Sequence, residues 1–163
     1  MKEGSIDHSQ VLRQFPYGLY VLGASRNGHP LFILANWVSQ VSFSPPLIAA
    51  AIEVEGKMHQ YISDSGCFSV NVLPGGRKEL ALAFLKSQEP TGGTVNGHSF
   101  QPAKHGSPLL DEASSCVECK VVARLETGDH TLFVGQITQS VLHTHAHGMT
   151  LKESGLNYQR KKS

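Results

Sequence analysis

The chain has 163 residues, of which 40% are hydrophobic and 17% are charged, and its formal net charge is +1. This length fits one domain with a single substantial core. The near-neutral charge offers no basic field for nucleic acid, and the hydrophobic content excludes a disordered chain.

The cysteine count and the first residues bear on the compartment. Cys67, Cys116 and Cys119 are an odd number, which a disulfide-framed secreted domain rarely has. The start of the chain lacks an apolar segment of signal-peptide length, and nowhere do about 18 apolar residues run together. We therefore expect a cytoplasmic protein without a membrane segment.

The first half of the chain predicts a meander of β-strands after a short amphipathic segment. Apolar residues fill positions 17–24, and the RNGH sequence at 26–29 is typical of the tight turns that close hairpins. A long strand-like segment at 34–44 ends at two prolines, which donate no hydrogen bond to a sheet. Residues 47–54 then indicate a buried strand.

The second half alternates helical and strand patterns. The predicted elements are, in order, a helix over Lys57–Ser65 capped by Gly66, a strand over 67–73, a helix over 77–86, a loop-rich excursion over 87–108 with one short strand, and strands over 115–125 and 131–143. Gly128 lies in the turn between the last two strands. Closely spaced strands with two short helices predict a mainly β fold, a closed or nearly closed antiparallel barrel.

The segment LANWVSQVSFSPPL, residues 34–47, separates into two faces when it is read with period two. The first face is expected to be core; its members are Ala35, Trp37, Ser39, Val41 and Phe43. The second face carries mostly hydrogen-bonding groups without charge; its members are Asn36, Val38, Gln40, Ser42 and Ser44. This second face is expected either to meet water or to line a ligand.

Two motifs contain residue types that bind metals, but each is explained better without a metal. Cys116 and Cys119 form a C-x-x-C, but residues three apart in a strand point to opposite faces, so buried structural thiols are favoured. The HTHAH stretch places His143, His145 and His147 at a spacing of two, which is able to hold a transition metal. Solvated loop histidines are favoured because no carboxylate or thiolate stands beside them. No metal site is predicted.

Two further motifs are consistent either with a binding site or with an ordinary solvated surface. Lys57 and His59 lie where a strand gives way to a helix, and a helix start with a basic side chain suits an anion. His130, in the GDH sequence at a hairpin mouth, suits a substrate-contacting histidine. Taken alone, each is more often a solvated surface position.

Taken in order, three stretches resemble the flavin reductase-like family of FMN-binding split barrels. They are ANWVSQVSFSPPL, CFSVNVL after a helix and a glycine, and LDEASSCVECKVV continuing into GDHTLFVGQI. The resemblance covers about residues 15–158. It implies one FMN-binding domain over residues 1–163, folded as a Greek-key split β-barrel with short flanking helices.

The resemblance also implies roles for particular residues. In the family, the first stretch runs along the isoalloxazine ring and ribityl chain of the flavin; the matching residues are Asn36, Trp37, Val38, Ser39, Gln40 and Ser42. The phosphate-holding element matches Lys57, Met58 and His59, although a hydroxyl residue is common where Met58 stands. Lys86 matches a further position near the cofactor. The GDH histidine, His130, would lie where nicotinamide enters.

The expected function is hydride transfer from NADH or NADPH to FMN, with FAD as the other candidate flavin, in a cytoplasmic homodimer. The reduced flavin would serve a partner monooxygenase or a redox protein. The resemblance assigns the dimer contacts to the 87–108 excursion and the C-terminal tail. The alternative is a module on the same fold that binds flavin or haem without being an enzyme, and a third reading is a metal protein that uses HTHAH.

Overall fold

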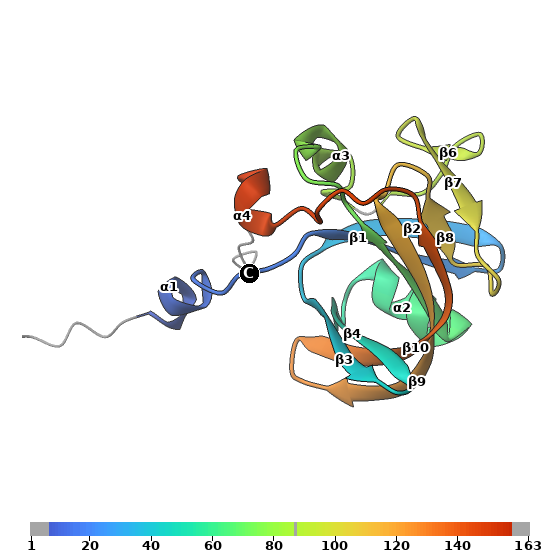
Figure 1. Cartoon of the computed structure of the whole chain (residues 1–163). Coiled ribbons are helices and arrows are strands. Elements are labelled where there is room, and N and C mark those ends of the chain that lie inside the picture. The colour runs from blue at the N-terminus through green and yellow to red at the C-terminus, as the bar shows by residue number, and fades with distance from the viewer. Residues whose placement is uncertain (1–6, 87, 158–163) are drawn as a thin grey trace, which may run out of the picture.

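The structure, a computed structural model, describes residues 7–86 and 88–157. It is mainly β with short helices (Figure 1), which confirms the predicted fold class. The strands are β1 Tyr20–Arg26, β2 His29–Ala35, β3 Val38–Phe43, β4 Pro46–Glu53, β5 Cys67–Val72, β6 Thr94–Val95, β7 His98–Pro102, β8 Pro108–Leu110, β9 Ser115–Glu126 and β10 His130–Leu142. The helices are α1 His8–Leu12, α2 Lys57–Ser65, α3 Lys78–Leu82 and α4 Leu151–Ser154.

Seven antiparallel strands form one sheet in the order β2-β1-β5-β9-β10-β4-β3. β2 and β3 follow each other in the chain but lie at opposite edges of this sheet. Only Asn36 and Trp37 connect them, and two extended residues reach no further than about 10 Å. The sheet must therefore curl until its edges nearly meet, which makes a barrel that is split between β2 and β3.

Two hydrophobic clusters fill the molecule. One lies among α2 and the strands β1, β2, β4, β5, β9 and β10, and includes Met58, Ile62, Phe68 and Phe133. The other joins the sheet to α3, α4 and the small sheet β6-β7-β8, and includes Phe32, Phe84 and Leu110. Residues 94–110 thus pack against their own chain, where the sequence had indicated a loop with one short strand.

Several local predictions hold. α2 spans residues 57–65 as expected, and Gly66 ends it in the left-handed conformation at φ 66°. β9 and β10 match the two final predicted strands within one residue. The second helix is shorter than expected, at Lys78–Leu82. In the described residues no helix is long and apolar enough to cross a membrane.

The long strand expected over residues 34–44 is wrong, because the chain leaves one sheet edge at Ala35 and joins the other at Val38. The expected face assignment is wrong as well. Trp37, Val41 and Phe43 are 38%, 53% and 89% exposed, whereas Asn36 is buried at 6%. β3 is an edge strand with a register shift between Gln40 and Ser42, so strict alternation breaks and its far end extends beyond the core.

Candidate functional site

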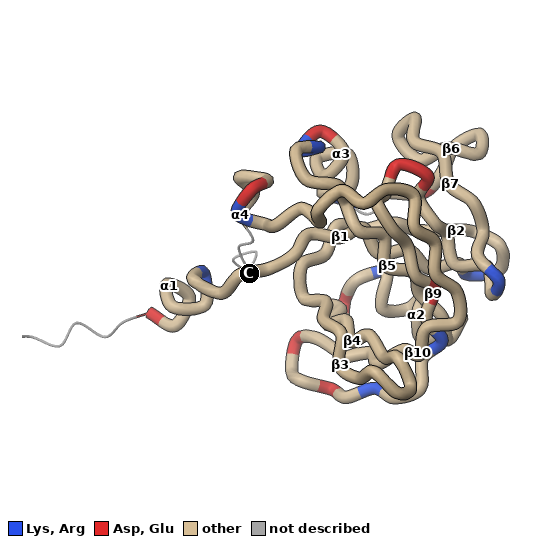
Figure 2. The backbone as a smooth tube through the Cα atoms, viewed as in Figure 1, with Lys and Arg blue, Asp and Glu red and all other residues tan. Residues whose placement is uncertain are grey.

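The split in the barrel is lined by a stretch of chain that carries no charge. No Lys, Arg, Asp or Glu occurs from residue 27 to residue 52. Figure 2 shows the result, with β3 tan throughout and β4 tan up to its last residue, Glu53. A hollow of about 250 Å³ lies beside Gln40, Val41, Ser42 and Phe43. This surface suits a ligand that forms hydrogen bonds but needs no ion pair along its length.

Asn36 stands inside the split with an unsatisfied amide. Its Nδ2 is buried and has no hydrogen-bond partner among residues 7–86 and 88–157. It lines a cavity of about 60 Å³ whose walls are otherwise mostly apolar; the other lining residues are Leu19, Leu34, Ala35, Leu85, Leu151, Leu156 and Asn157. A buried N–H donor without an acceptor costs about 1–3 kcal/mol, so this amide is suited to a ligand oxygen or nitrogen.

Trp37, the second residue of the connection, is in ring contact with His130. Their ring centroids are 4.7 Å apart, with the planes tilted by 51°. His130 begins β10, and its side chain is only 12% exposed. Its Nδ1 donates to Asp129 Oδ1 at 2.7 Å, which fixes the ring and leaves Nε2 as the atom to meet a substrate. No local pattern predicts that these two rings touch, because they lie 93 positions apart in the chain.

The three successive residues at the start of α2 point in different directions, since a helix turns by about 100° per residue. Lys57 is exposed, and its Nζ lies 3.2 Å from Glu89 Oε1. Met58 is 1% exposed in the inner core, so only its backbone N–H is left for a ligand. The Nε2 atom of His59 lies 2.9 Å from Thr131 Oγ1, within hydrogen-bond distance. Of the three side chains, only that of Lys57 is exposed, so an anion at the start of α2 would meet Lys57 and backbone N–H groups.

The remaining predicted flavin-binding residues differ in how exposed they are. Ser39 and Gln40 are exposed on β3, while Val38 and Ser42 are half-buried. Lys86 is exposed after α3.

The two metal-type motifs form no site in the described residues, where no cluster of three or more His, Cys, Asp or Glu side chains gathers. His147 Nε2 instead lies 3.5 Å from Glu153 Oε1. Cys116 and Cys119 belong to different hydrophobic clusters, as the strand spacing predicted. Burial raises the pKa of both thiols to about 12, so both remain protonated and unreactive at neutral pH.

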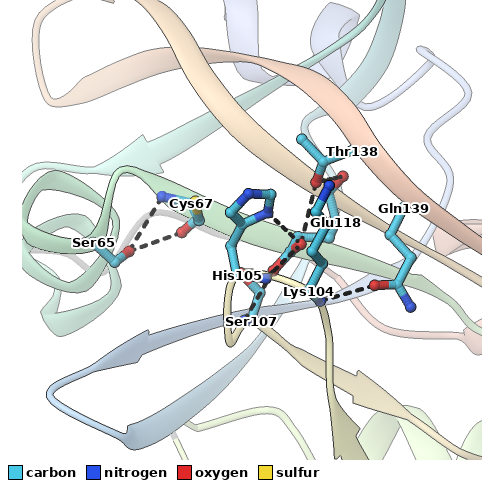
Figure 3. Close-up of polar contacts among 8 residues, drawn as sticks. All are labelled: Ser65, Cys67, Lys104, His105, Ser107, Glu118, Thr138 and Gln139. Atoms are coloured by element: carbon cyan, nitrogen blue, oxygen red, sulfur yellow. Dashed lines mark hydrogen bonds and ion pairs between the residues drawn. The ribbon is translucent and has the colours of Figure 1, made fainter.

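One polar cluster was missed by the sequence reading. Glu118 on β9 has a fully buried side chain that holds the loop before β8 (Figure 3). The backbone N–H groups of His105 and Ser107 donate to its carboxylate at 3.0 and 3.1 Å, as do His105 Nδ1 at 2.9 Å and Thr138 Oγ1 at 3.1 Å. Burial works to raise the pKa of Glu118, but these hydrogen bonds outweigh it and hold the pKa below its ordinary value. A single Glu between apolar residues of a predicted strand was the feature that could have indicated this buried carboxylate.

The sequence matches the family described as flavin reductase like domain over residues 12–163. A putative diflavin flavoprotein of Nostoc sp. is 31% identical over 153 residues, which cover 90% of this chain and 27% of that protein. The chain thus spans about a quarter of the length of such relatives. A ferric-chelate reductase (NAD(P)H) of Archaeoglobus fulgidus is 32% identical over 134 residues, covering 78% of this chain and 76% of that one.

Among solved structures, an NADH:FAD oxidoreductase of Streptomyces globisporus C-1027 superposes with a TM-score of 0.77 at 26% identity. The superposition covers 92% of this chain and 90% of that chain. The structural likeness therefore extends over most of both chains.

Proposed function

Because this chain belongs to the flavin reductase-like family, we propose that it is an enzyme that transfers a hydride from NADH or NADPH to a flavin. The observation that carries the proposal is the unsatisfied Nδ2 of Asn36 in the split. An isoalloxazine ring presents carbonyl oxygens and ring nitrogens as acceptors, so one of them would satisfy this donor. The apolar walls of the cavity, which measures about 60 Å³, suit one edge of this flat aromatic ring.

The proposed flavin contacts combine the split with the exposed part of β3. Asn36 would donate to the ring, and Trp37 would contact its plane. The uncharged groups of β3 would follow the ribityl chain; they are Val38, Ser39, Gln40 and Ser42. Neutral groups bind a flavin without favouring one charge on the ring, which suits a cofactor that is repeatedly reduced and reoxidised.

FMN is the flavin we propose, with FAD as the other candidate. Lys57 and the first backbone N–H groups of α2 would hold the phosphate, since Gly56 provides no side-chain cap for them. Glu89 is paired with Lys57 and would have to yield to a phosphate. The affinities for FMN, FAD and riboflavin decide this point, because riboflavin lacks the phosphate and FAD extends beyond it.

The proposed catalytic role of His130 is to position the nicotinamide. A bound flavin supplies the ring that accepts the hydride. The chain itself holds His130 by the bond to Asp129 and by contact with Trp37, so the imidazole Nε2 has a fixed direction. Hydride transfer depends on stacking and close approach rather than on an acid or base. The lack of a strongly basic side chain among these residues therefore fits the proposed chemistry.

A homodimer in the cytoplasm is the proposed setting, with residues 1–163 acting as one flavin-binding domain. Three free thiols suit a reducing compartment. The reduced flavin would pass to a monooxygenase or another redox protein. Because the chain matches only part of the diflavin proteins, an electron-carrying module remains the second candidate.

Steady-state oxidation of NADH and NADPH, with each flavin added, tests the proposal. We expect turnover that saturates with flavin and that falls at least tenfold in Asn36→Leu. Leu125→Ala, at an exposed position on β9, is a suitable control. A flavin that stays bound with little turnover favours the electron-carrying module, and an absence of both binding and turnover contradicts both candidates.

A further inference from the structure

A short arm, residues 7–16, stands away from the rest of the molecule. α1 has no buried residue, and Figure 1 shows it clear of the barrel. Three of its apolar side chains are half exposed: Val11 at 49%, Leu12 at 52% and Phe15 at 56%. A helix of five residues is not stable in water without packing. The arm therefore needs a surface that its own barrel does not give it.

The root of the arm is fixed next to the Asn36 cavity. The N–H of Leu151 donates to Tyr17 O at 2.9 Å, and the N–H of Leu19 donates to Met149 O at 2.8 Å. Leu19 and Leu151 are both cavity residues. The residue before a proline avoids the helical conformation, so Pro16 ends the helical turns of the arm at Phe15. The arm thus starts beside the cavity of its own chain without lying across it.

Within the described part of the chain, the mouth of the cavity is mostly apolar and is not covered by another element. Leu85 is 54% exposed and lines the cavity, and Leu82 on α3 is 43% exposed. Exposed leucines next to an open apolar hollow are typical of a surface that binds an apolar side chain. The arm and the cavity mouth therefore have matching chemistry.

We propose that the arm of one chain packs across the cavity mouth of a second copy, with Phe15 against Leu85, and that the second arm does the same in return. A twofold pair of this kind leaves neither an arm nor a cavity mouth uncovered. The proposal rests on the proposed function in one respect. Since the cavity contains Asn36, the partner's arm would help to keep water from the bound flavin.

The area of the exchange sets its share of the dimer contact. Three half-exposed side chains offer on the order of 200 Å² per arm, and the receiving surface offers a similar area. Two exchanges then bury roughly half of the ~1,600 Å² typical of a stable interface. Other surfaces of the two copies must meet as well, so removing the arm need not dissociate the dimer. The test is therefore which residues of the partner chain the arm contacts.

Cysteine cross-linking of the full chain tests the contact. In the double variant Phe15→Cys and Leu85→Cys, we expect a disulfide between chains, seen as a covalent dimer on a non-reducing gel. The matched control joins Phe15→Cys to Leu125→Cys, which is 61% exposed on the β9 hairpin, and should give no such dimer. The native thiols are buried and stay unreactive. A disulfide within one chain, or none at all, overturns the proposal.

Flavin binding separates this proposal from the proposed function. Phe15→Ser should weaken flavin affinity several-fold, whereas Leu12→Ser, whose side chain lies further from Pro16, should weaken it less. If the cross-link forms but the wild-type chain binds no flavin, the arm exchange stands and the proposed function fails. If flavin binds equally well to wild type and Phe15→Ser, and no cross-link forms, the exchange fails alone.

Discussion

Replacing Glu118 with Gln should destabilise the fold by about 4 kcal/mol. The carboxylate accepts four hydrogen bonds from three residues, His105, Ser107 and Thr138, in a fully buried position. A Gln amide is neutral, so none of these hydrogen bonds keeps a charged acceptor. A hydrogen bond to a charged group contributes about 1.5–3 kcal/mol and one between neutral groups about 1 kcal/mol, so the four bonds weaken by roughly 1 kcal/mol each. The total is a large share of the ~5–15 kcal/mol that holds a domain folded.

Urea denaturation followed by far-ultraviolet circular dichroism measures this loss as a lower midpoint at unchanged slope. The control is Glu126→Gln, a carboxylate that is 77% exposed and should change stability by less than about 0.5 kcal/mol. A Glu118→Gln chain within about 1 kcal/mol of wild type would refute the role assigned to this carboxylate.

The same variant should change how stability depends on pH. The pKa of Glu118 in the folded chain lies below its ordinary value of 4.5. Its stabilisation is therefore fully present above pH 4.5 and is lost as the pH falls through the lower folded pKa. Wild type should lose this contribution on acidification, and Glu118→Gln should not. Parallel pH curves for the two proteins would contradict this linkage.

Three further predictions follow from the packing and the site. Gly135→Ala should cost about 1–3 kcal/mol in urea denaturation, because a Cβ there would lie 2.7 Å from the ring of Phe68. His130→Ala should lower kcat/KM for the nicotinamide about tenfold and change flavin affinity little, as measured by steady-state kinetics and flavin titration. The three buried thiols should react with a thiol reagent at pH 8 only as fast as the chain unfolds, and added urea should accelerate labelling.

Features with a local cause were predictable from the sequence. α2 was placed correctly because its apolar spacing and the capping glycine lie within ten residues. The opposite burial of Cys116 and Cys119 followed from strand geometry alone. The resemblance to split-barrel flavin proteins predicted the overall fold. The family match over residues 12–163 confirms that resemblance.

Features that depend on sheet closure were not predictable. Apolar alternation continues through Asn36 and Trp37, so nothing local marks the point where the chain crosses from β2 to β3. The exposure of Val41 and Phe43 follows from the place of β3 at the sheet edge, which only the strand order reveals. The Trp37 and His130 contact likewise depends on the pairing of β4 with both β3 and β10.

Fluorescence of Trp37 tests the central claim most directly, because it is the single tryptophan of the chain and it lies in the proposed flavin site against His130. Titration with FMN should quench its emission in a saturable way, and Asn36→Leu should shift the midpoint to higher FMN concentration. A tryptophan signal unchanged by FMN or FAD, apart from the linear loss due to flavin absorption, would contradict a flavin site at the split of this barrel.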